Sequence, residues 1–257
     1  MKVIHPTAII DKNAELAPDA EVGPYSVIEA GARIGTGARI GSHVVIQGNT
    51  TIGSNCTISP FASIGGPPQD IGYKYEPTQV IIGDNNTIKE YVTINRGTTK
   101  GGGITKVGNN NFIMAYAHIA HDCQVGSSII MANGATLAGH VEVSDFVIFS
   151  GLCAVHQFCR VGKYAFISGL TGIPKDVPPF VIAAGDRAKL YGLNIVGLER
   201  RNFSKEEITK LKRAYRILFR SALPLKTSLK IIRDELDGDS ISYLLEFIET
   251  STRGICR

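Results

Sequence analysis

An aliphatic residue recurs at every sixth position along most of this chain. The series runs through Ile4, Ile10, Leu16, Val22, Ile28, Ile34, Ile40, Ile46, Ile52, Ile58 and Ile64, resumes at Ile82, Ile88 and Ile94, and continues after a one-residue shift from Val107 to Ile173. A period of six fits neither an amphipathic helix nor a simply alternating strand. It predicts short strands joined by tight corners, three to each eighteen-residue coil, which is the pattern of an all-β, left-handed parallel β-helix.

The other positions of the repeat fit a narrow coil. The fifth position of each unit is usually small, as at Ala32, Ala38, Ser63, Ala117 and Ala135. Four of the five cysteines also fall there, at Cys56, Cys123, Cys153 and Cys159. A small residue at this position packs beneath the inward aliphatic side chain, so we interpret these cysteines as core residues rather than nucleophiles.

Two segments interrupt the repeat and are expected to be excursion loops. Residues 65–81 are rich in proline and glycine, and residues 97–106 contain the run GTTKGGG. The repeat ends near Pro174, Pro178 and Pro179. We therefore expect a β-helix over residues 1–177, a connecting segment over 178–203 and a C-terminal helical domain over 204–257.

Helical signals follow the last proline. Ser204 and Glu207 form a capping-box pattern before the apolar series Ile208, Leu211, Tyr215 and Leu218. Further helices are expected over 226–236 and 240–250. This domain would cover the end of the coil, where strand edges are otherwise exposed.

Composition narrows the function classes. The formal net charge of +4 is too small to indicate nucleic-acid binding. An odd number of cysteines without a CxxC pair fits a reducing compartment, and no apolar run is long enough to span a membrane. With the repeat beginning at Ile4, we expect no signal peptide, no integral membrane segment and a cytoplasmic location.

Four of the six histidines are predicted to converge on one edge of the coil. Residues eighteen apart stack at about 4.8 Å, the usual spacing of strands. The units that begin at Ile119, Leu137 and Val155 therefore stack, and they carry His121, His140 and His156, while His118 precedes the first of them. Gly139 stacks on His121, and Gln157 completes that column.

These residue types suit acyl transfer. A neutral imidazole can take a proton from an attacking hydroxyl or amine, so His121 is the candidate general base. The Gly139 N–H is the candidate oxyanion donor. Asp122 could orient the base, but adjacent side chains on a strand point apart, so we expect a weaker role for it. Solvated or interface histidines are the alternative interpretation of the cluster.

Several sequence motifs, distributed along the whole chain, point to one protein family. AHIAHDCQVG (117–126), LAGHVEV (137–143), GLCAVHQFCRVG (151–162), KDVPPFVIAAGD (175–186), GLNIVGLERRNF (192–203) and PPQD (67–70) together resemble the UDP-N-acetylglucosamine acyltransferase family. The resemblance implies a homotrimer with active sites between neighbouring β-helices. It also implies an (R)-3-hydroxyacyl donor carried on acyl carrier protein, a UDP-amino-sugar acceptor, the first step of lipid A synthesis, and no metal or organic cofactor.

The resemblance also assigns residues. His121 matches the general base and Asp122 its partner. Residues that match the substrate-binding positions are Gln69, Asp70, His118, His140, His156, Gln157, Asn194, Arg200 and Arg201. Gly169 and Arg187 match positions along the acyl groove, where an open glycine implies a chain longer than about ten carbons.

Three residues depart from the family pattern. Gly72 stands where lysine is usual, with Lys74 nearby, Val196 stands where an acidic residue is common, and Arg187 replaces a frequent histidine. The first two leave open whether the acceptor presents a 3-hydroxyl or a 3-amine. The third, Arg187, concerns the length of the acyl chain that the groove accepts.

A basic stretch near the C-terminus is the candidate docking surface for the acidic carrier protein. It comprises Lys205, Lys210, Lys212, Arg213, Arg216, Arg220, Lys226, Lys230 and Arg233, against Glu206 and Glu207. A solvated helical face is the alternative.

Three other functions compete with this interpretation. One is a zinc hydro-lyase resembling the γ-class carbonic anhydrases, with His118, His121 and His140 as ligands. Another is the N-acyltransferase that acts later in the same pathway, although that enzyme carries an additional N-terminal uridine-binding domain. The third is a non-catalytic scaffold.

Overall fold

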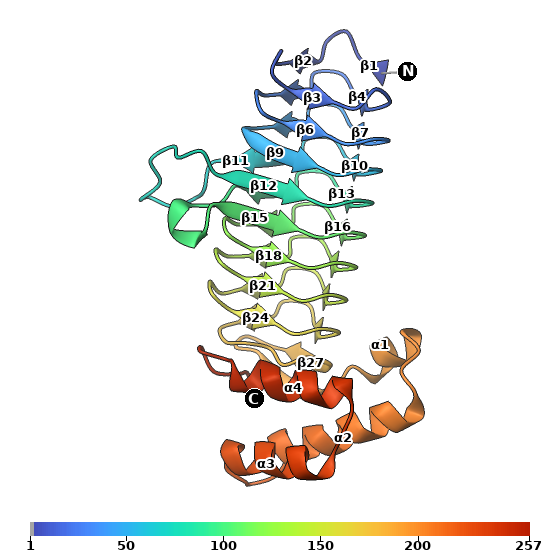
Figure 1. Ribbon diagram of the computed structural model, residues 1–257, viewed down its shortest axis with the longest axis vertical. Helices are drawn as coiled ribbons and strands as arrows, with labels where there is room; N and C mark the ends of the chain where they lie inside the picture. The colour runs from blue at the N-terminus through green and yellow to red at the C-terminus, as the bar shows by residue number, and fades with distance from the viewer. Residues whose placement is uncertain (1–2) are drawn as a thin grey trace.

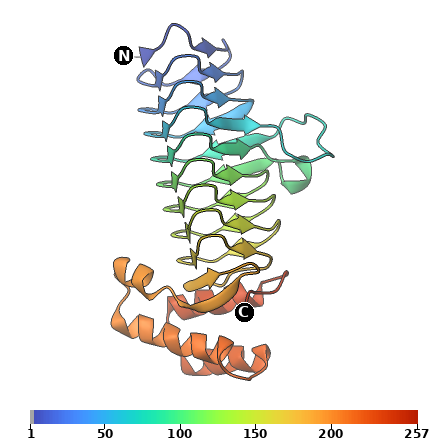
Figure 2. The ribbon, with the colours of Figure 1, turned by 180° about the vertical axis from the view of Figure 1, so that it is seen from behind.

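The computed structural model describes residues 3–257, and it confirms the predicted left-handed parallel β-helix. Figure 1 shows a stack of coils that ends in a group of helices, with two loops projecting from one side. The view from behind shows the same loops on a single edge (Figure 2). Each coil contributes one short strand to each of three sheets, here named A, B and C.

The strand bounds follow the six-residue repeat. Sheet A contains β1 Val3–Ile4, β4 Glu21–Val22, β7 Arg39–Ile40, β10 Thr57–Ile58, β13 Thr87–Ile88, β16 Phe112–Ile113, β19 Ile130–Met131, β22 Ile148–Phe149, β25 Phe166–Ile167, β27 Val181–Ala184 and β28 Lys189–Leu193. Sheet B contains β2 Ile9–Ile10, β5 Val27–Ile28, β8 Val45–Ile46, β11 Ser63–Gly66, β14 Thr93–Asn95, β17 His118–Ile119, β20 Thr136–Leu137, β23 Ala154–Val155 and β26 Gly172–Ile173. Sheet C contains β3 Glu15–Leu16, β6 Arg33–Ile34, β9 Asn49–Ile52, β12 Gln79–Ile82, β15 Ile104–Val107, β18 Gln124–Val125, β21 Glu142–Val143 and β24 Arg160–Val161. Apart from the antiparallel pair β27–β28, the paired strands are parallel.

The core is a column of stacked aliphatic side chains. Ile40 pairs with Ile58 across neighbouring coils, and Ile58 pairs with Ile88. Burying one such side chain contributes roughly 2 kcal/mol. The fifth position is filled as expected by buried Ala32, Ala38, Ala117 and Ala135, and the four cysteines are buried and free. Ser63 is an error of register, because it lies in β11 beside Ile64 and the buried small residue is Ala62.

The corners of the coil are left-handed. The residue three places after the inward aliphatic has a positive φ, as at Tyr25, Asn55, Asp122, His140 and Phe158. This conformation is unusual for residues other than glycine and asparagine. It turns the chain sharply, so the residues on each side of it do not follow the alternation of a strand.

Both projecting loops leave the coil at the corner between sheets B and C, here called the B/C corner. One connects β11 to β12, and the other connects β14 to β15 and contains the 3-10 turn Thr99–Gly101. Stacked residues Ile58 and Ile88 are thirty positions apart in the sequence, and Ile88 and Ile113 twenty-five apart, instead of eighteen.

Helices close the C-terminal end. They are α1 Ile195–Arg200, α2 Lys205–Phe219, α3 Leu225–Glu235 and α4 Asp239–Glu249. The capping box of Ser204 and Glu207 is formed at the start of α2. The last residues return to the coil, where Asp176 bridges Ile255. Within residues 3–257, no helix has the length and apolar character that a membrane span requires.

Candidate active site

The predicted catalytic residues lie together at the B/C corner, just below the two loops. Two columns run down this corner: His121, Gly139 and Gln157, and beside them Asp122, His140 and Phe158. The rings of His121 and His140 meet edge to face at 5.2 Å, and His140 stacks on Phe158 at 4.4 Å. Phe158 lies eighteen residues after His140, so its place in the cluster was readable from the repeat.

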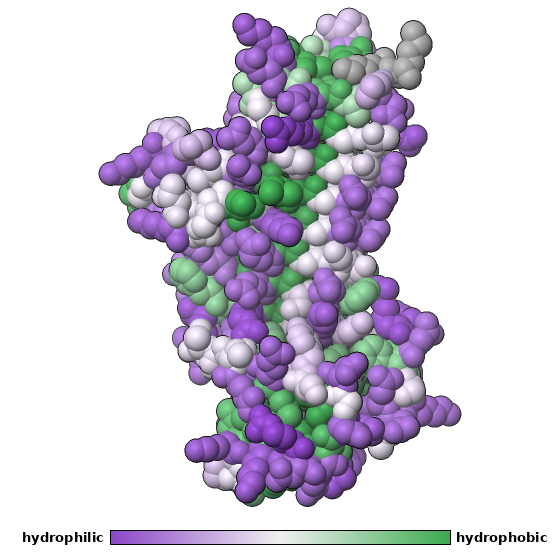
Figure 3. Space-filling view, in the orientation of Figure 1, coloured by the Kyte–Doolittle hydropathy of each residue, from purple (hydrophilic) through white to green (hydrophobic). Residues whose placement is uncertain are grey.

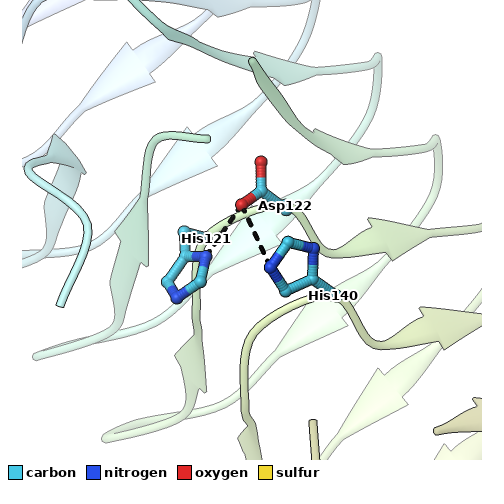
Figure 4. A group of neighbouring side chains, drawn as sticks. All are labelled: His121, Asp122 and His140. Carbon is cyan, nitrogen blue, oxygen red and sulfur yellow. Dashed lines mark hydrogen bonds and ion pairs between the residues drawn. The ribbon is translucent and has the colours of Figure 1, made fainter. Parts of the chain in front are cut away.

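His121 and Asp122 form a direct pair. His121 Nδ1 lies 2.8 Å from Asp122 Oδ2, and the other ring nitrogen, Nε2, has no hydrogen-bond partner among the described residues (Figure 4). The expectation that adjacent side chains would diverge is wrong, because these residues lie in a corner and Asp122 has a φ of 61°. An ionised carboxylate at this distance fixes the proton on Nδ1 and leaves Nε2 as the basic nitrogen.

The Asp122 carboxylate is fully enclosed by the second excursion loop. Oδ1 accepts a hydrogen bond from Thr98 N at 2.8 Å, and Oδ2 accepts one from Thr98 Oγ1 at 2.7 Å. The Asp122 backbone N–H donates to Thr105 Oγ1. Cβ atoms built on Gly97 and Gly101 would lie within 3 Å of the carboxylate, so both positions need glycine. From the sequence alone, this loop was predicted only as an excursion from the coil, with no role at the site.

Gly139 leaves space for the base. A Cβ atom there would lie 2.6 Å from His121 Cε1, so the imidazole packs directly on the glycine. Among the described residues, none accepts a hydrogen bond from the Gly139 N–H. A free backbone donor beside the base is the arrangement that stabilises a developing oxyanion.

The neighbouring histidines are held neutral. Burial lowers the pKa of His118, with His121 a second cause, and His118 Nδ1 bonds Thr93 Oγ1 at 2.7 Å. Burial likewise lowers the pKa of His140. His140 Nε2 is 3.6 Å from Asp122 Oδ2, which is too long for a hydrogen bond. His121 is therefore the histidine that Asp122 orients.

His156 and Gln157 lie one coil further down and are exposed. His156 makes no contact with His121, and its Nδ1 lies 3.3 Å from Arg253 Nη2 on the returning C-terminal segment. The predicted cluster thus divides into three neighbouring histidines and a separate His156. Arg253 had no signal in the repeat because it follows the last helix.

A groove of about 390 Å³ runs over sheet B beside His156. The side chains on its floor become smaller from Thr136 to Ala154 to Gly172, and Asp186 and Arg187 also line it. Gly169 lies outside this lining, exposed at the corner between sheets A and B. The groove has the shape and apolar floor that suit an alkyl chain.

The first loop brings Gln69 and Asp70 toward the site. Asp70 lies close enough to His140 to oppose the lowering of the His140 pKa. Its Oδ1 accepts the Gly72 N–H at 2.8 Å. The cation nearest Gly72 is Lys100 of the second loop, whereas the backbone N–H of Lys74 is tied to Glu76.

Asn194, Arg200 and Arg201 lie elsewhere. They line a cavity of about 500 Å³ on the outer face of sheet A, together with Ile130, Ile148, Phe166, Ile182, Val196 and Gly197. Asn194 caps α1 through Gly197 N, and Arg201 lies over the Phe146 ring. In a three-sided coil, sheet A is opposite the B/C corner. Within a single chain, these residues and His121 therefore lie on opposite sides of the coil.

Several cations of the basic stretch form ion pairs with carboxylates that are distant in the sequence. Lys210 pairs with Glu206 and Asp237, Arg213 pairs with Glu235, and Arg233 pairs with Glu249. Arg220 lies over the Tyr215 ring. The remaining cations, Lys205, Lys212, Arg216, Lys226 and Lys230, form no ion pair within residues 3–257. Figure 3 shows hydrophilic side chains over most of this helical end.

Comparison with known proteins identifies the family. Residues 176–256 match the model of domain 2 of UDP N-acetylglucosamine O-acyltransferase, residues 104–139 match the bacterial transferase hexapeptide model, and residues 3–101 match the GMPPB C-terminal domain. The chain is 58% identical over its full length to the acyl-[acyl-carrier-protein]–UDP-N-acetylglucosamine O-acyltransferase of Thermodesulfovibrio yellowstonii, and 55% identical to that of Janthinobacterium sp., with each relative also covered completely.

A solved structure agrees with this assignment. The UDP-N-acetylglucosamine acyltransferase of Francisella novicida superposes with a TM-score of 0.96 at 44% identity, covering 99% of this chain and 94% of that one. The similarity extends over the coil, both loops and the helical end. The chain therefore belongs to the UDP-N-acetylglucosamine O-acyltransferase family, as its histidine motifs predicted.

Proposed function

We propose that this chain transfers an (R)-3-hydroxyacyl group from acyl carrier protein to the 3-position of UDP-N-acetylglucosamine, the first step of lipid A biosynthesis. The observation that carries the proposal is the pair of His121 and Asp122, 2.8 Å apart, beside the free N–H of Gly139. Relatives at 53–58% identity are named for this reaction.

The transfer proceeds in two steps at this pair. His121 Nε2 takes the proton of the acceptor hydroxyl as its oxygen attacks the thioester carbonyl carbon. The tetrahedral intermediate places its negative oxygen at the Gly139 N–H. The C–S bond then breaks, and the imidazolium returns the proton to the departing phosphopantetheine thiolate. Asp122 stabilises the imidazolium between the two steps. The chain's own residues supply each role, and no metal or organic cofactor is assigned to the reaction.

The substrates occupy separate surfaces. The alkyl chain lies in the groove over sheet B, past His156 toward Arg187. A long chain would continue beyond the groove lining to Gly169. Gln69, Asp70, His118, His140 and Gln157 surround the sugar. Asn194, Arg200 and Arg201 bind the nucleotide end, where arginines suit a diphosphate.

The separation of these surfaces supports assembly of several copies, and we propose a homotrimer. Sheet A and the B/C corner are opposite sides of one coil, so a single chain cannot bring Arg200 to His121. Packing sheet B of one copy against sheet A of the next completes the site, and two repeats of that packing close a three-membered ring. We propose the cytoplasm as the location, since the five free thiols suit a reducing compartment.

Acyl carrier protein is proposed to dock on the uncompensated cations of the helical end. Arg216 and Lys212 on α2 are suitable probes, whereas Arg220 also supports Tyr215. Reversing both charges should raise the apparent KM for the carrier, with Lys12→Glu at the other end of the coil as the control for net charge. An unchanged KM would place docking elsewhere.

A 3-amino acceptor is the second candidate. Val196 places an apolar side chain beside Arg200 and Arg201, and at Gly72 the first loop offers no side chain of its own, with Lys100 of the second loop nearby. The test compares UDP-N-acetylglucosamine with its 3-amino analogue, using (R)-3-hydroxyacyl carrier protein as the donor. Transfer to the first supports the O-acyl reaction, and transfer to the second alone supports an N-acyl reaction. If neither accepts the acyl group, the proposed function is wrong.

A further inference from the structure

The Asp122 carboxylate is more constrained than pairing with His121 requires. Its side chain has no exposed surface, and it accepts three hydrogen bonds of 2.7–2.8 Å. Two of the three donors belong to one residue, Thr98, which lies in the second excursion loop. A carboxylate with no exposed surface is stable only when hydrogen-bond donors satisfy its oxygens, as they do here.

Thr98 is itself held in place by its loop. Its hydroxyl donates to Asp122 Oδ2 and accepts the Gly101 N–H at 3.1 Å, as the cap of the 3-10 turn. The carbonyl of Thr98 accepts the Gly103 N–H at 2.8 Å. Gly101 has no room for a Cβ against the carboxylate, and Gly102 and Gly103 have φ values of 90° and 82°. The GGG run thus meets two requirements around Asp122: Gly101 leaves room for the carboxylate, and Gly102 and Gly103 adopt positive φ values.

We infer that Thr98 is a positioning residue for the reaction: through Asp122, it fixes His121 with its proton on Nδ1 and Nε2 free to act as the base. This inference rests on the proposed function of His121. A chain of donors runs from Gly101 N–H through the Thr98 hydroxyl to Asp122, and the His121 Nδ1–H meets the carboxylate from the other side. Without the Thr98 hydroxyl, Asp122 Oδ2 loses one of its two donors and the Gly101 N–H loses its side-chain acceptor, while the backbone N–H of residue 98 still holds Oδ1.

The first test is kinetic. Thr98→Val removes the hydroxyl and keeps the shape, Thr98→Ser restores the donor, and Thr99→Val at the exposed next position is the control. A hydrogen bond to a charged group is worth a factor of about ten or more in rate. We expect kcat to fall at least about tenfold in Thr98→Val with both KM values little changed. Thr98→Ser and Thr99→Val should stay near the unmodified protein.

Coupling to Asp122 separates positioning from a general loss of structure. In a chain that carries Asp122→Ala, adding Thr98→Val should produce no further loss of kcat. Comparable thermal unfolding of the single variants establishes that the fold is kept. A full additional loss in the double variant, or an undiminished kcat in Thr98→Val, would overturn the inference.

A spectroscopic readout is independent of activity. Long-range ¹H–¹⁵N spectra distinguish the two neutral tautomers of histidine, and His121→Gln assigns the signal. The full chain should show His121 protonated on Nδ1, and Thr98→Val should shift it toward a mixture with the Nε2 form. An unchanged tautomer in Thr98→Val contradicts the inference even if the acyl substrate proves to be wrong. Absence of acyl transfer in the unmodified protein, with the tautomer shift present, contradicts only the proposed function.

Discussion

The ammonium of Lys100 lies over Gly72, where a Cβ atom would be 3.2 Å from Lys100 Nζ. The two residues come from different excursion loops, and Asp70 lies on the other side of the glycine, 3.4 Å from the same point. A lysine side chain starting at position 72 would have to displace this ammonium. The second loop therefore supplies a positive charge to the space that a side chain of the first loop would otherwise occupy.

Removing that charge should weaken acceptor binding. We expect Lys100→Ala to raise the KM for the UDP-sugar about threefold to tenfold, as an exposed charged contact contributes about 1 kcal/mol. Adding Gly72→Lys to this variant should lower the KM again, because the new ammonium enters the vacated space. Steady-state kinetics at saturating acyl carrier protein donor measures the KM for the UDP-sugar in both variants. A KM that is unaffected by Lys100→Ala would mean that the cation does not contact the acceptor.

Gly139→Ala tests the space beside the base. The added methyl group would lie 2.6 Å from His121 Cε1, so the imidazole must move. We expect kcat to fall by about a hundredfold or more, since small displacements of reacting groups are costly. Gly151→Ala is the control, because its Cβ would have an ordinary 3.4 Å contact with Asn133 O. Equal effects of the two substitutions would show that His121 does not need this clearance.

The six-residue repeat contains enough information to place several residues of this site. Eighteen-residue stacking places Gly139 against His121, and the same count places Phe158 on His140. The role of Asp122 beside His121 was underestimated from strand geometry, because left-handed corners are recognised by glycine or asparagine and here the corner residue is the aspartate itself.

Residues outside the repeat could not be placed by counting. Thr98 lies in an insertion that breaks the register, so nothing in its spacing points to Asp122. Arg253 reaches His156 only because the chain returns to the coil after α4. The separation of Arg200 from His121 depends on which sheet α1 covers, and that is decided by packing after the repeat ends.

Acidification should destabilise the fold through its neutral histidines. Burial lowers the folded-state pKa of His118 and of His140 below the usual histidine pKa of about 6.5. Above this value both states are unprotonated and the stability is complete. As the pH falls below it, the unfolded chain binds protons that the folded chain does not, so the free energy of unfolding decreases. We expect the Tm to fall between about pH 7 and pH 5, and to fall less in His118→Asn. An equal fall in both proteins would assign the pH dependence to other groups.

Gly169→Met should shorten the preferred acyl chain. The glycine is exposed at the corner between sheets A and B, and the nearest contact of an added Cβ is 3.5 Å, so a longer side chain can project from it. A methionine there would occupy the end of the proposed alkyl path. We expect kcat/KM for donors longer than about ten carbons to fall relative to shorter donors, measured in competition. An unchanged preference would place the end of the chain elsewhere.

An exposed aromatic ladder provides the last test, that of the proposed trimer. At the corner between sheets A and B, rings stack at 4.9–5.1 Å in the order Tyr25, His43, Phe61, Tyr91 and Tyr116. Phe61 is 47% exposed, and like the other residues of the ladder it has the left-handed backbone of these corners. If sheet B of one copy packs on sheet A of the next, this corner faces the threefold axis, and the rings of three copies meet there.

Phe61→Asp would then place three carboxylates together in an apolar seam. We expect it to convert the trimer into monomers in sedimentation equilibrium and to abolish transfer, because each site would lose the arginines of its neighbour. Asn85→Asp makes the same change of charge at an exposed left-handed corner between sheets C and A, which the packing leaves outside the seam. That variant should remain trimeric and active. A trimeric, active Phe61→Asp would require a different packing, in which the ladder faces solvent and another surface brings Arg200 to His121.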